Sequence, residues 1–414
     1  MSDLLKNKEI VLGVCGGIAA YKAVAFTRHL VKAGSRVRVV MTRAAERFVG
    51  PMTFEALSGY PVWTRMFDRR AGAAFPHIAW AESANAVVII PATGNIIGKI
   101  ANGIADDALT TLLLAVSAPV LVCPSMNVRM YENPRVQKNM AVLREEGMHL
   151  VEAASGPLAC GEEGIGRLAD LETIMEGLMG ILSVQDLKGS HLLVTAGPTR
   201  EFMDPVRFVS NPSSGKMGYA LARVAKRRGA DVVLVSGPTC LSAPQGVEFI
   251  RVQSAQEMYD AVMGRVTHRS IVIKAAAVCD WRPTTVYDQK LKKEQALAPE
   301  IAFERTPDIL KTLGEAKTDQ VSDQISGQIS DQVLVGFAAE TENVTENAAA
   351  KMGAKNLDMI VANPVGSVDS GFGADTNQAT LLFKDGDSQS LPLYSKERLA
   401  EVILDKVVEM RAKA

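Results

Sequence analysis

The feature that most constrains the fold of this chain is a regular alternation of short apolar runs with amphipathic helical stretches. The runs are bounded by glycine, proline or hydroxyl residues, and they are continuous rather than alternately apolar and polar. Continuous runs of this kind are typical of parallel strands that helices cover on both faces. The expected strands are 10–14, 37–41, 87–90 and 120–123 in the first half, and 192–196, 232–235, 271–275, 333–336 and 359–362 in the second, which closes with a hairpin-like pair near 380–393 and a final helix.

Both halves are therefore predicted to be doubly wound α/β units, Rossmann-like or flavodoxin-like, with ligands beyond the carboxyl ends of the strands. A chain of 414 residues is too long for one ordinary core. A predicted helix over 170–182 ends in the polar stretch 183–189, where a fresh strand begins. We expect two domains in tandem, residues 1–186 and residues 187–414.

Composition excludes several classes of partner. A net charge of -1 with 47% apolar residues indicates a soluble globular protein without net attraction for nucleic acid or an anionic membrane. No apolar run approaches the ~20 residues that cross a bilayer, and the charged start runs straight into a strand rather than a signal or transit peptide. The five cysteines are an odd number without a CxxC pair, which favours a reducing cytoplasm.

The strand ends of the first half indicate a mononucleotide site. The glycine turn over 13–22 opens a helix whose free amides suit a phosphate, although it is not the GxGxxG pattern of dinucleotide sites. The second strand leads into Thr42, a hydroxyl where an NAD site places an acid for the ribose. A tight strand-to-helix turn without a ligand is the alternative.

Three further side chains of the first half are candidates for chemistry. His77 lies in a loop that enters a helix, where an imidazole can meet substrate near neutral pH; loop packing is the alternative. Asn127 follows a strand and offers amide donors to a carboxylate, or it caps the next helix. Cys160 lies in 156–167, a segment with four glycines and almost nothing to form a core, which suits a proton donor on a closing flap.

An anion site is also predicted in the second half, although no P-loop is present. The loop over 210–218 is rich in hydroxyls and glycine and precedes a helix. Its Gly-Lys pair lacks both the leading glycine and the following Ser/Thr of a P-loop. A helix cap with a solvated loop is the alternative to an anion site.

Lysines of the second half sit where a triphosphate could be held. Lys290 opens a basic run on a long loop, ten residues after Asp280, as a clamp on a triphosphate would; a solvated face is the alternative. Lys351 and Lys355 share a helix face at four-residue spacing. One more segment, 319–332, repeats itself in polar residues and is expected to be a disordered surface insertion, with a functional lid as the alternative.

Together these motifs resemble known families. GGIAAYK, the His77 loop, PATGN, NGIADD, PSMNVRM and ACGEEGIGR, in this order, resemble the flavin-dependent cysteine decarboxylases, specifically phosphopantothenoylcysteine decarboxylase, over nearly all of residues 8–182. From about residue 187 to the final helix, interrupted only by 319–332, the chain resembles phosphopantothenate-cysteine ligase. The whole is similar to the bifunctional bacterial coenzyme A biosynthesis family. The resemblance implies ligation of cysteine to 4'-phosphopantothenate through an acyl-cytidylate, followed by decarboxylation to 4'-phosphopantetheine.

For the first half, the resemblance implies FMN as cofactor, with His77 as the base at the flavin, Asn127 holding the substrate carboxylate and Cys160 donating a proton. The implied cofactor-binding residues are Gly16, Gly17, Ile18, Thr42, Thr93 and Asn95. Flavin oxidation of the substrate thiol to a thioaldehyde gives the electrons of the departing carboxylate a sink, and the reaction is redox neutral overall, so no nicotinamide is required.

For the second half, the resemblance implies CTP and Mg²⁺, with Asn211 at the activated acyl group and Lys290 at the triphosphate. The implied nucleotide-binding residues are Asp280, Lys290, Pro307, Asp308, Ile309, Leu310, Phe337, Lys351 and Lys355. A carboxylate repels an attacking amine until it becomes a mixed anhydride, and the metal and lysines neutralise the phosphates during that step. The residues alone leave ATP open and indicate no metal ligands.

The expected partners are the small substrates and further copies of the chain. Because the resemblance places FMN sites between subunits, we expect trimers or larger assemblies of the first domain and dimers of the second, in the cytoplasm. Two rival functions remain: an NAD(P)-dependent reductase, disfavoured by the missing dinucleotide pattern, and a silent flavin-binding regulator. The presence of His77, Asn127 and Cys160 weighs against the regulator.

Overall fold

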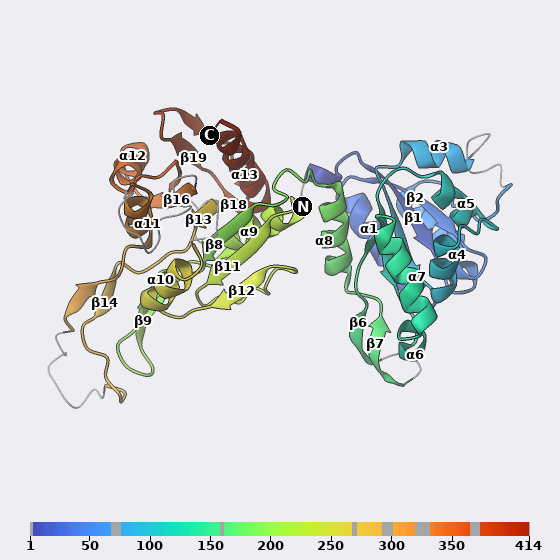
Figure 1. The fold of residues 1–414 in the computed structure, drawn as a ribbon, viewed down its shortest axis with the longest axis horizontal. Helices are drawn as coiled ribbons and strands as arrows, with labels where there is room; N and C mark the ends of the chain where they lie inside the picture. Colours follow the sequence, from blue (N-terminus) through green and yellow to red (C-terminus); the bar gives the residue numbers. More distant parts are fainter. Residues whose placement is uncertain are drawn as a thin grey trace. The chain divides into compact units, whose positions relative to one another are not determined.

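The chain forms two compact units, Met1–Val184 and Gln185–Ala414, each of which is described by itself (Figure 1). The computed structural model describes residues 3–67, 76–157, 161–266, 271–291, 301–318, 332–364 and 373–413. Within these ranges, no helix combines the length and apolar character that a membrane span requires.

The first unit is built on a five-stranded, wholly parallel sheet of order β2-β1-β3-β4-β5. Its strands are β1 (Glu9–Val14), β2 (Arg36–Met41), β3 (Ala86–Ala92), β4 (Val120–Pro124) and β5 (His149–Leu150). Every residue of β1 and β3 is buried, as expected for strands covered on both faces. The winding reverses between β1 and β3, and in sheets of this order the ligand lies at that point, beyond the carboxyl ends.

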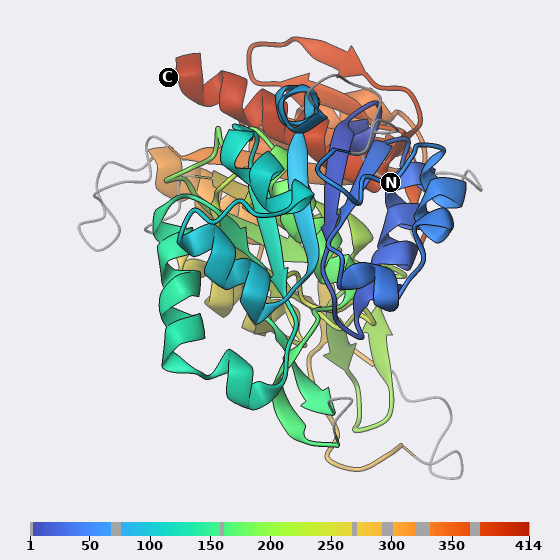
Figure 2. The same ribbon diagram turned by 90° about the vertical axis from the view of Figure 1, so that its right-hand side faces the viewer.

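Helices cover both faces of this sheet (Figure 2). They are α1 (Ala20–Lys32), α2 (Pro51–Ser58), α3 (Pro76–Ser83), α4 (Gly94–Ala101), α5 (Ala108–Ala115), α6 (Val128–Tyr131), α7 (Pro134–Glu145) and α8 (Leu171–Leu182), with short 3-10 turns η1 (Asp3–Leu5) and η2 (Ala45–Arg47). One core contains Phe26 of α1 and Leu178 of α8; the other contains Ile97 of α4 and Leu143 of α7. A separate antiparallel pair, β6 (Ala154–Pro157) and β7 (Glu163–Arg167), follows the last strand.

The second unit is built on an eight-stranded sheet of order β12-β11-β8-β13-β16-β17-β19-β20. Its strands are β8 (His191–Ala196), β11 (Asp231–Ser236), β12 (Glu248–Arg251), β13 (Ile271–Lys274), β16 (Val333–Glu340), β17 (Met359–Pro364), β19 (Thr380–Phe383) and β20 (Ser388–Ser390). The first six are parallel, and β19 pairs antiparallel with both neighbours. The winding reverses between β8 and β13, the Rossmann-like arrangement.

The second unit also has helices on both faces. They are α9 (Lys216–Arg227), α10 (Ala255–Met263), α11 (Ile309–Thr318), α12 (Val344–Ala354) and α13 (Lys396–Lys413). Leu221 of α9 and Ile403 of α13 share one core, and Met258, Leu313 and Ala348 of the other three helices share the second. Three short antiparallel pairs lie outside the main sheet: β9 (Arg200–Phe202) with β10 (Phe208–Ser210), β14 (Trp281–Pro283) with β15 (Phe303–Arg305), and β18 (Thr376–Asn377) with β21 (Tyr394–Ser395).

The predicted fold class, two doubly wound α/β units with parallel sheets, is confirmed. The predicted hairpin near 380–393 is the antiparallel pair β19 and β20. The predicted insertion over 319–332 lies outside the described residues except for Gln332, which is buried.

Candidate functional site

The first unit has a cavity of about 430 Å³ at the carboxyl edge of its sheet. Residues that follow β1, β2, β3 and β4 contribute to it, as the doubly wound topology requires. Its lining consists of Cys15, Gly16, Thr42, Arg43, Ala44, Thr93, Gly94, Asn95, Ile96, Lys99, Asp107, Ser125, Met126 and Met130. Four of the six predicted cofactor-binding residues are among them; Gly17 and Ile18 are not, and Ile18 is 63% exposed.

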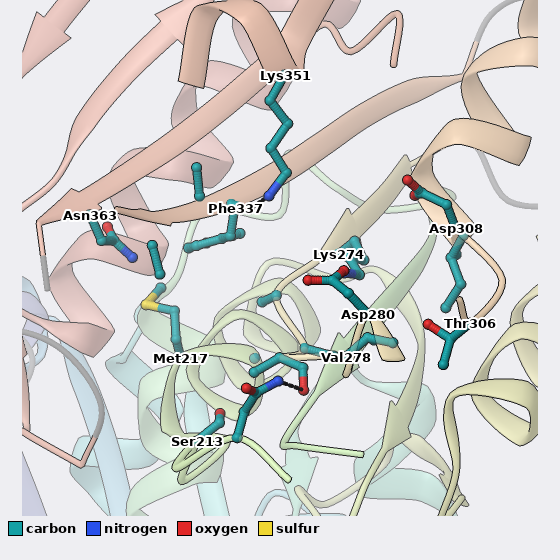
Figure 3. Close-up of a pocket in the computed structure, with 18 of the residues that line it drawn as sticks. Ser213, Met217, Lys274, Val278, Asp280, Thr306, Asp308, Phe337, Lys351 and Asn363 are labelled. Atoms are coloured by element: carbon teal, nitrogen blue, oxygen red, sulfur yellow. Dashed lines mark hydrogen bonds between the residues drawn. The ribbon is translucent and has the colours of Figure 1, made fainter. Parts of the chain in front are cut away.

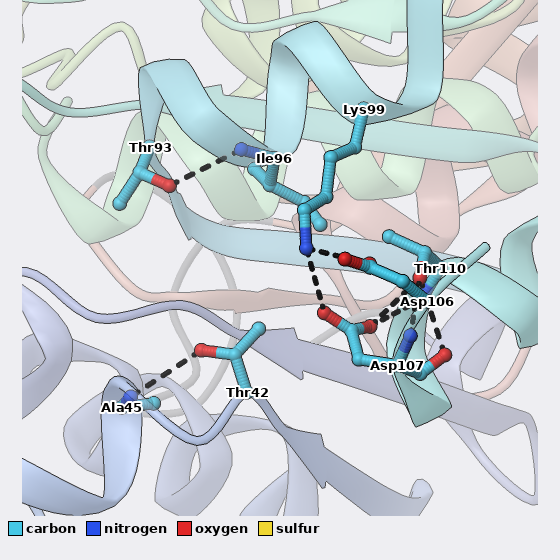
Figure 4. Close-up of polar contacts among 8 residues, drawn as sticks. All are labelled: Thr42, Ala45, Thr93, Ile96, Lys99, Asp106, Asp107 and Thr110. Carbon is cyan, nitrogen blue, oxygen red and sulfur yellow. Dashed lines mark hydrogen bonds and ion pairs between the residues drawn. The ribbon is translucent and has the colours of Figure 1, made fainter. Parts of the chain in front are cut away.

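Two threonines place hydroxyl groups at this cavity. Thr93 caps α4, with its Oγ1 accepting from the Ile96 amide at 3.3 Å, and Thr42 Oγ1 accepts from the Ala45 amide at 3.3 Å (Figure 4). Because a hydroxyl also has one donor hydrogen, each threonine can still donate to an anionic or carbonyl oxygen. The local backbone therefore orients both hydroxyls before a ligand arrives.

Lys99 brings a cation to the same cavity and is held by two carboxylates. Its Nζ lies 2.6 Å from Asp106 Oδ1 and 3.4 Å from Asp107 Oδ2 (Figure 4). The hydrogen bond to Asp106 raises the pKa of Lys99. Asp107 also caps α5, because its Oδ1 accepts from the Thr110 amide at 2.8 Å. Lys99 is thus fixed in place and remains charged.

The structure explains the size and the chemical state of two residues in the glycine turn, Gly16 and Cys15. A Cβ on Gly16 would lie 2.4 Å from Ala44 Cβ, so no larger residue fits there without movement. The thiol of Cys15 is buried, and burial raises its pKa to about 12. Cys15 therefore stays protonated near neutral pH and is not a thiolate.

The catalytic candidates of the first unit fall outside that lining. His77 is partly buried in the first turn of α3, and Cys160 lies outside the described residues. Asn127 caps α6, with Oδ1 accepting from the Arg129 amide at 2.8 Å, so the capping role that its position allowed is present. Its Nδ2 donates to Glu162 Oε2 at 2.6 Å. Glu162 is two residues after Cys160, so the middle of the glycine-rich segment lies against Asn127.

The second unit has a larger cavity, of about 980 Å³, also at the carboxyl edge of the sheet (Figure 3). The lining comes from the start of α9, the ends of β13, β16 and β17, the start of α11 and one face of α12. Predicted residues that line it are Asn211, Asp280, Pro307, Asp308, Ile309, Phe337, Lys351 and Lys355. Leu310 instead belongs to the core at 1% exposure, and Lys290 is exposed and does not line the cavity.

The predicted lysines of α12 are oriented by different partners. Lys355 Nζ pairs with Asp308 Oδ2 at 2.7 Å, and Lys351 Nζ donates to the Phe337 carbonyl at 3.2 Å. Burial lowers the pKa of Lys351, and the charge of Lys355 lowers it further. Burial raises the pKa of Asp308, but hydrogen bonds from Lys355 and from the Lys311 amide lower it more, so Asp308 is ionised. The two lysine side chains make this end of the cavity suitable for binding an anion.

Asn211 connects two of the loops around the cavity. Its Nδ2 donates to the Ala277 carbonyl at 3.1 Å, which ties the loop before α9 to the loop after β13. The two loops therefore meet at the wall of the cavity.

The lining also includes polar residues that were not predicted, among them Lys274, Asn363, Asn377 and Lys396. Lys274 ends an otherwise apolar strand, and a charge at that place in a buried run is a signal that sequence reasoning could have used. Asn363 Oδ1 is buried and has no hydrogen-bond partner among the described residues. Lys396 follows β21, and Asn377 belongs to β18, two strands too short to be predicted.

In the described parts of the chain, no three or more His, Cys, Asp or Glu side chains come together as a metal site.

The comparisons with known proteins first define a class. Residues 1–183 match the family described as Flavoprotein, and residues 187–410 match the DNA/pantothenate metabolism flavoprotein C-terminal domain. Two doubly wound units, each with a cavity at the carboxyl edge of its sheet, agree with a two-domain flavoprotein.

Relatives then narrow the class to one family. The chain is 48% identical over 411 residues to the coenzyme A biosynthesis bifunctional protein CoaBC of Bacillus subtilis (strain 168), covering 98% of each chain. It is 44% identical over 407 residues to CoaBC of Escherichia coli (strain K12), covering 98% of this chain and 97% of that one. A crystal structure of the C-terminal domain of CoaBC is 44% identical and covers 56% of this chain and 100% of that chain, with a TM-score of 0.46. The chain belongs to the coenzyme A biosynthesis bifunctional protein family, as the motifs predicted.

Proposed function

We infer that the chain is a bifunctional enzyme of coenzyme A biosynthesis. It ligates cysteine to 4'-phosphopantothenate and then decarboxylates phosphopantothenoylcysteine to 4'-phosphopantetheine. The observation that carries this inference is 48% identity to a bifunctional coenzyme A biosynthesis protein over 98% of both chains, because so long a match includes both halves in the same order. We assign the decarboxylase to residues 1–186 and the ligase to residues 187–414.

The ligase proposal draws further support from the larger cavity. Lys351 and Lys355 bring positive charge to a site that also contains Asn211. CTP is the proposed nucleotide, and Mg²⁺ would enter with its phosphates, since Mg²⁺ is commonly held by one or two carboxylates plus substrate phosphates. Asp280 is a suitable carboxylate at the cavity wall. The lysines and metal would neutralise the triphosphate while the acyl-cytidylate forms.

The smaller cavity fits the proposed FMN. The hydroxyls of Thr42 and Thr93, the amides of the turn at Gly16 and the side chain of Asn95 offer hydrogen bonds suited to a phosphate and a polar ring edge. When bound, FMN would supply the two-electron chemistry that makes loss of CO₂ possible. Asn127 would hold the substrate carboxylate, His77 would act as base and Cys160 as proton donor.

The direct test is to incubate the purified, FMN-loaded protein with 4'-phosphopantothenate, cysteine, Mg²⁺ and either CTP or ATP. Pyrophosphate and CO₂ should both appear, with CTP preferred. Pyrophosphate without CO₂ would remove the decarboxylase half of the proposal. Absence of both products, with either nucleotide, would remove the whole of it.

Self-assembly of the chain is also proposed, as trimers or larger assemblies of the first unit and dimers of the second. Three large apolar side chains near the neighbouring helices α1 and α2 are exposed: Ile18 at 63%, Tyr21 at 61% and Met52 at 78%. Large exposed apolar side chains are suited to contacts with another subunit. Light scattering on the intact protein measures the assembly directly.

A further inference from the structure

Lys274 is a cavity residue of the second unit with no role assigned above. It is the last residue of β13, where it lies opposite Thr195 of β8 and Gly336 of β16. Side chains alternate along a strand, so Lys274 shares a face with Val272, which packs in the core beneath α11 and α12. The lysine therefore continues a buried row of side chains out into the cavity, which Lys351 of α12 also lines (Figure 3).

The ammonium group of Lys274 has no paired carboxylate among the described residues. Within the described ranges, Lys274 has neither a hydrogen bond nor an ion pair, although its side chain is partly buried. The charged groups that act on it are Lys351 of α12, Lys355 at the end of that helix, Asp308 at the start of α11 and Asp280 after β13. Asp308 is already paired with Lys355 at 2.7 Å.

The surroundings of Lys274 disfavour its charged form. Burial lowers the pKa of Lys274 from 10.5 to about 8, and the charges of Lys351 and Lys355 act in the same direction, against those of Asp308 and Asp280. Three ammonium groups face two carboxylates, so a polyanion in the cavity would restore the balance. An ammonium group has three donors and no acceptor, and its charge adds attraction for the anionic oxygens of a phosphate chain that a neutral base does not offer.

We propose that Lys274 binds the phosphate chain of the nucleotide and takes up a proton as the nucleotide enters. The proposal rests on the ligase function given above. It adds one phosphate-binding residue to the nucleotide-binding residues that the family resemblance implies. The nucleotide would then meet lysines from two directions, Lys351 and Lys355 from α12 and Lys274 from the edge of the sheet.

The first experiment measures which part of the nucleotide the side chain senses. Titration calorimetry with CTP, CMP and cytidine, each with MgCl₂, is carried out on the wild type, on Lys274→Met, and on Lys406→Met as the control. Lys406 is a lysine of α13 that pairs with Glu409 at 2.8 Å and does not line the cavity. The Kd for CTP should rise about tenfold in Lys274→Met, equivalent to ~1.4 kcal/mol, with a smaller rise for CMP, none for cytidine and none in the control.

The second experiment measures the proton. At pH 8 the free wild-type protein carries Lys274 about half protonated, so binding of CTP should take up about half a proton, seen as a dependence of the calorimetric heat on the ionisation enthalpy of the buffer. At pH 6.5 the lysine is already charged and the uptake should vanish. Lys274→Arg, which is charged at both values, should retain affinity for CTP and show no uptake at pH 8.

The outcomes separate this inference from the proposed function. If the wild type binds neither CTP nor ATP, the ligase function fails. If the wild type binds CTP but takes up no proton, the coupling of binding to protonation is wrong. If Lys274→Met weakens CTP and cytidine by the same factor, the assignment of Lys274 to the phosphates is wrong and the side chain is structural. Because the wild-type proton measurement needs no variant, a poorly folded Lys274→Met would not remove the test.

Discussion

Lys290 and Lys355 show two ways in which a lysine can be presented to a nucleotide. Lys355 is held at the cavity by Asp308 before any ligand is present. Lys290 is exposed and lies outside the lining, next to Leu291, whose amide donates to Asp204 Oδ2 at 3.2 Å. The contact of Lys290 with the triphosphate therefore stays a prediction.

Replacing Lys290 should separate the two activities. We expect Lys290→Gln to slow ligation by at least about tenfold, ~1.4 kcal/mol of barrier, because one positive charge on the triphosphate is lost. Pyrophosphate release reports ligation, and CO₂ release from supplied phosphopantothenoylcysteine reports decarboxylation, which should be unchanged. Equal loss of both activities would contradict separate sites.

Asn127 combines a structural and a chemical task in one side chain. Its Oδ1 caps α6 and its Nδ2 donates to Glu162. Asn127→Asp keeps the capping oxygen but replaces the donor with a negative charge beside Glu162. We expect CO₂ release to fall at least about tenfold, because an aspartate repels the substrate carboxylate, while the thermal midpoint changes little.

A second capping asparagine provides the control for that variant. Asn133 caps α7, with Oδ1 accepting from the Arg135 amide at 3.0 Å. Asn133→Asp should preserve both stability and CO₂ release. If Asn127→Asp retains full activity as well, the role of Asn127 is limited to capping.

The close contact of helix α11 with the end of helix α12 positions Lys351 and Lys355 at the larger cavity. Gly314 of α11 lies so near this end that a Cβ on it would be 2.0 Å from the Lys355 carbonyl oxygen. Asn356 Nδ2 also donates to the Gly314 carbonyl at 3.3 Å. The absence of a side chain at Gly314 therefore sets the separation between Asp308 on one helix and Lys355 on the other.

A matched pair of glycine variants tests this contact. Gly314→Ala should lower the free energy of unfolding by about 1–3 kcal/mol, as overpacking does, and should weaken binding of CTP, because the helices must move apart. Gly353→Ala, in α12 with nothing within 4 Å of its Cβ, should instead raise stability by up to about 1 kcal/mol. Urea denaturation measures both. Equal effects of the two substitutions would mean that the contact is not tight.

The parallel strands could be predicted because each carries its own signal. The run 87–90 lies within β3, and 120–123 lies within β4, where burial on both faces requires continuous apolar residues. The hairpin of β6 and β7 has no such signal, since it contains three glycines and almost all of its residues are partly or fully exposed. It forms because backbone pairing, together with Gly166, whose Cβ would lie 2.3 Å from the Met126 carbonyl oxygen, holds it against the loop before α6.

The candidate sites were likewise predictable from the sequence only in part. Residues that directly follow predicted strands, such as Thr42 and Thr93, line the cavity where the sequence predicted them. Lys274 was missed because it was counted as part of a strand, and Glu162 was missed because its contact with Asn127 depends on tertiary structure between residues 35 positions apart. Sequence reasoning identifies groups by chemical type and strand end, but it cannot supply distances across loops.

At the scale of the whole molecule, each unit has its own interior. Two hydrophobic cores contain only residues of the first unit, and two others contain only residues of the second. Arg228 attaches the first residues of the second unit to its last helix, because it pairs with Asp186 at 2.6 Å and with Asp405 at 2.7 Å. Leu187 beside it is fully buried in a core of that unit. The residues just after Val184 therefore belong structurally to the second unit.

Dividing the gene product after Val184 should accordingly yield two folded proteins. We expect residues 1–184 to bind FMN and residues 185–414 to bind CTP, each with a single cooperative unfolding transition, because no core is cut. A shorter fragment, 189–414, is the control: it lacks Leu187 and Asp186, so it should lose about 2–4 kcal/mol of stability from the missing leucine and ion pair. Calorimetry on the three fragments and the intact chain measures this. If fragment 185–414 is unfolded, or if 189–414 is equally stable, the start of the second unit contributes nothing to its core.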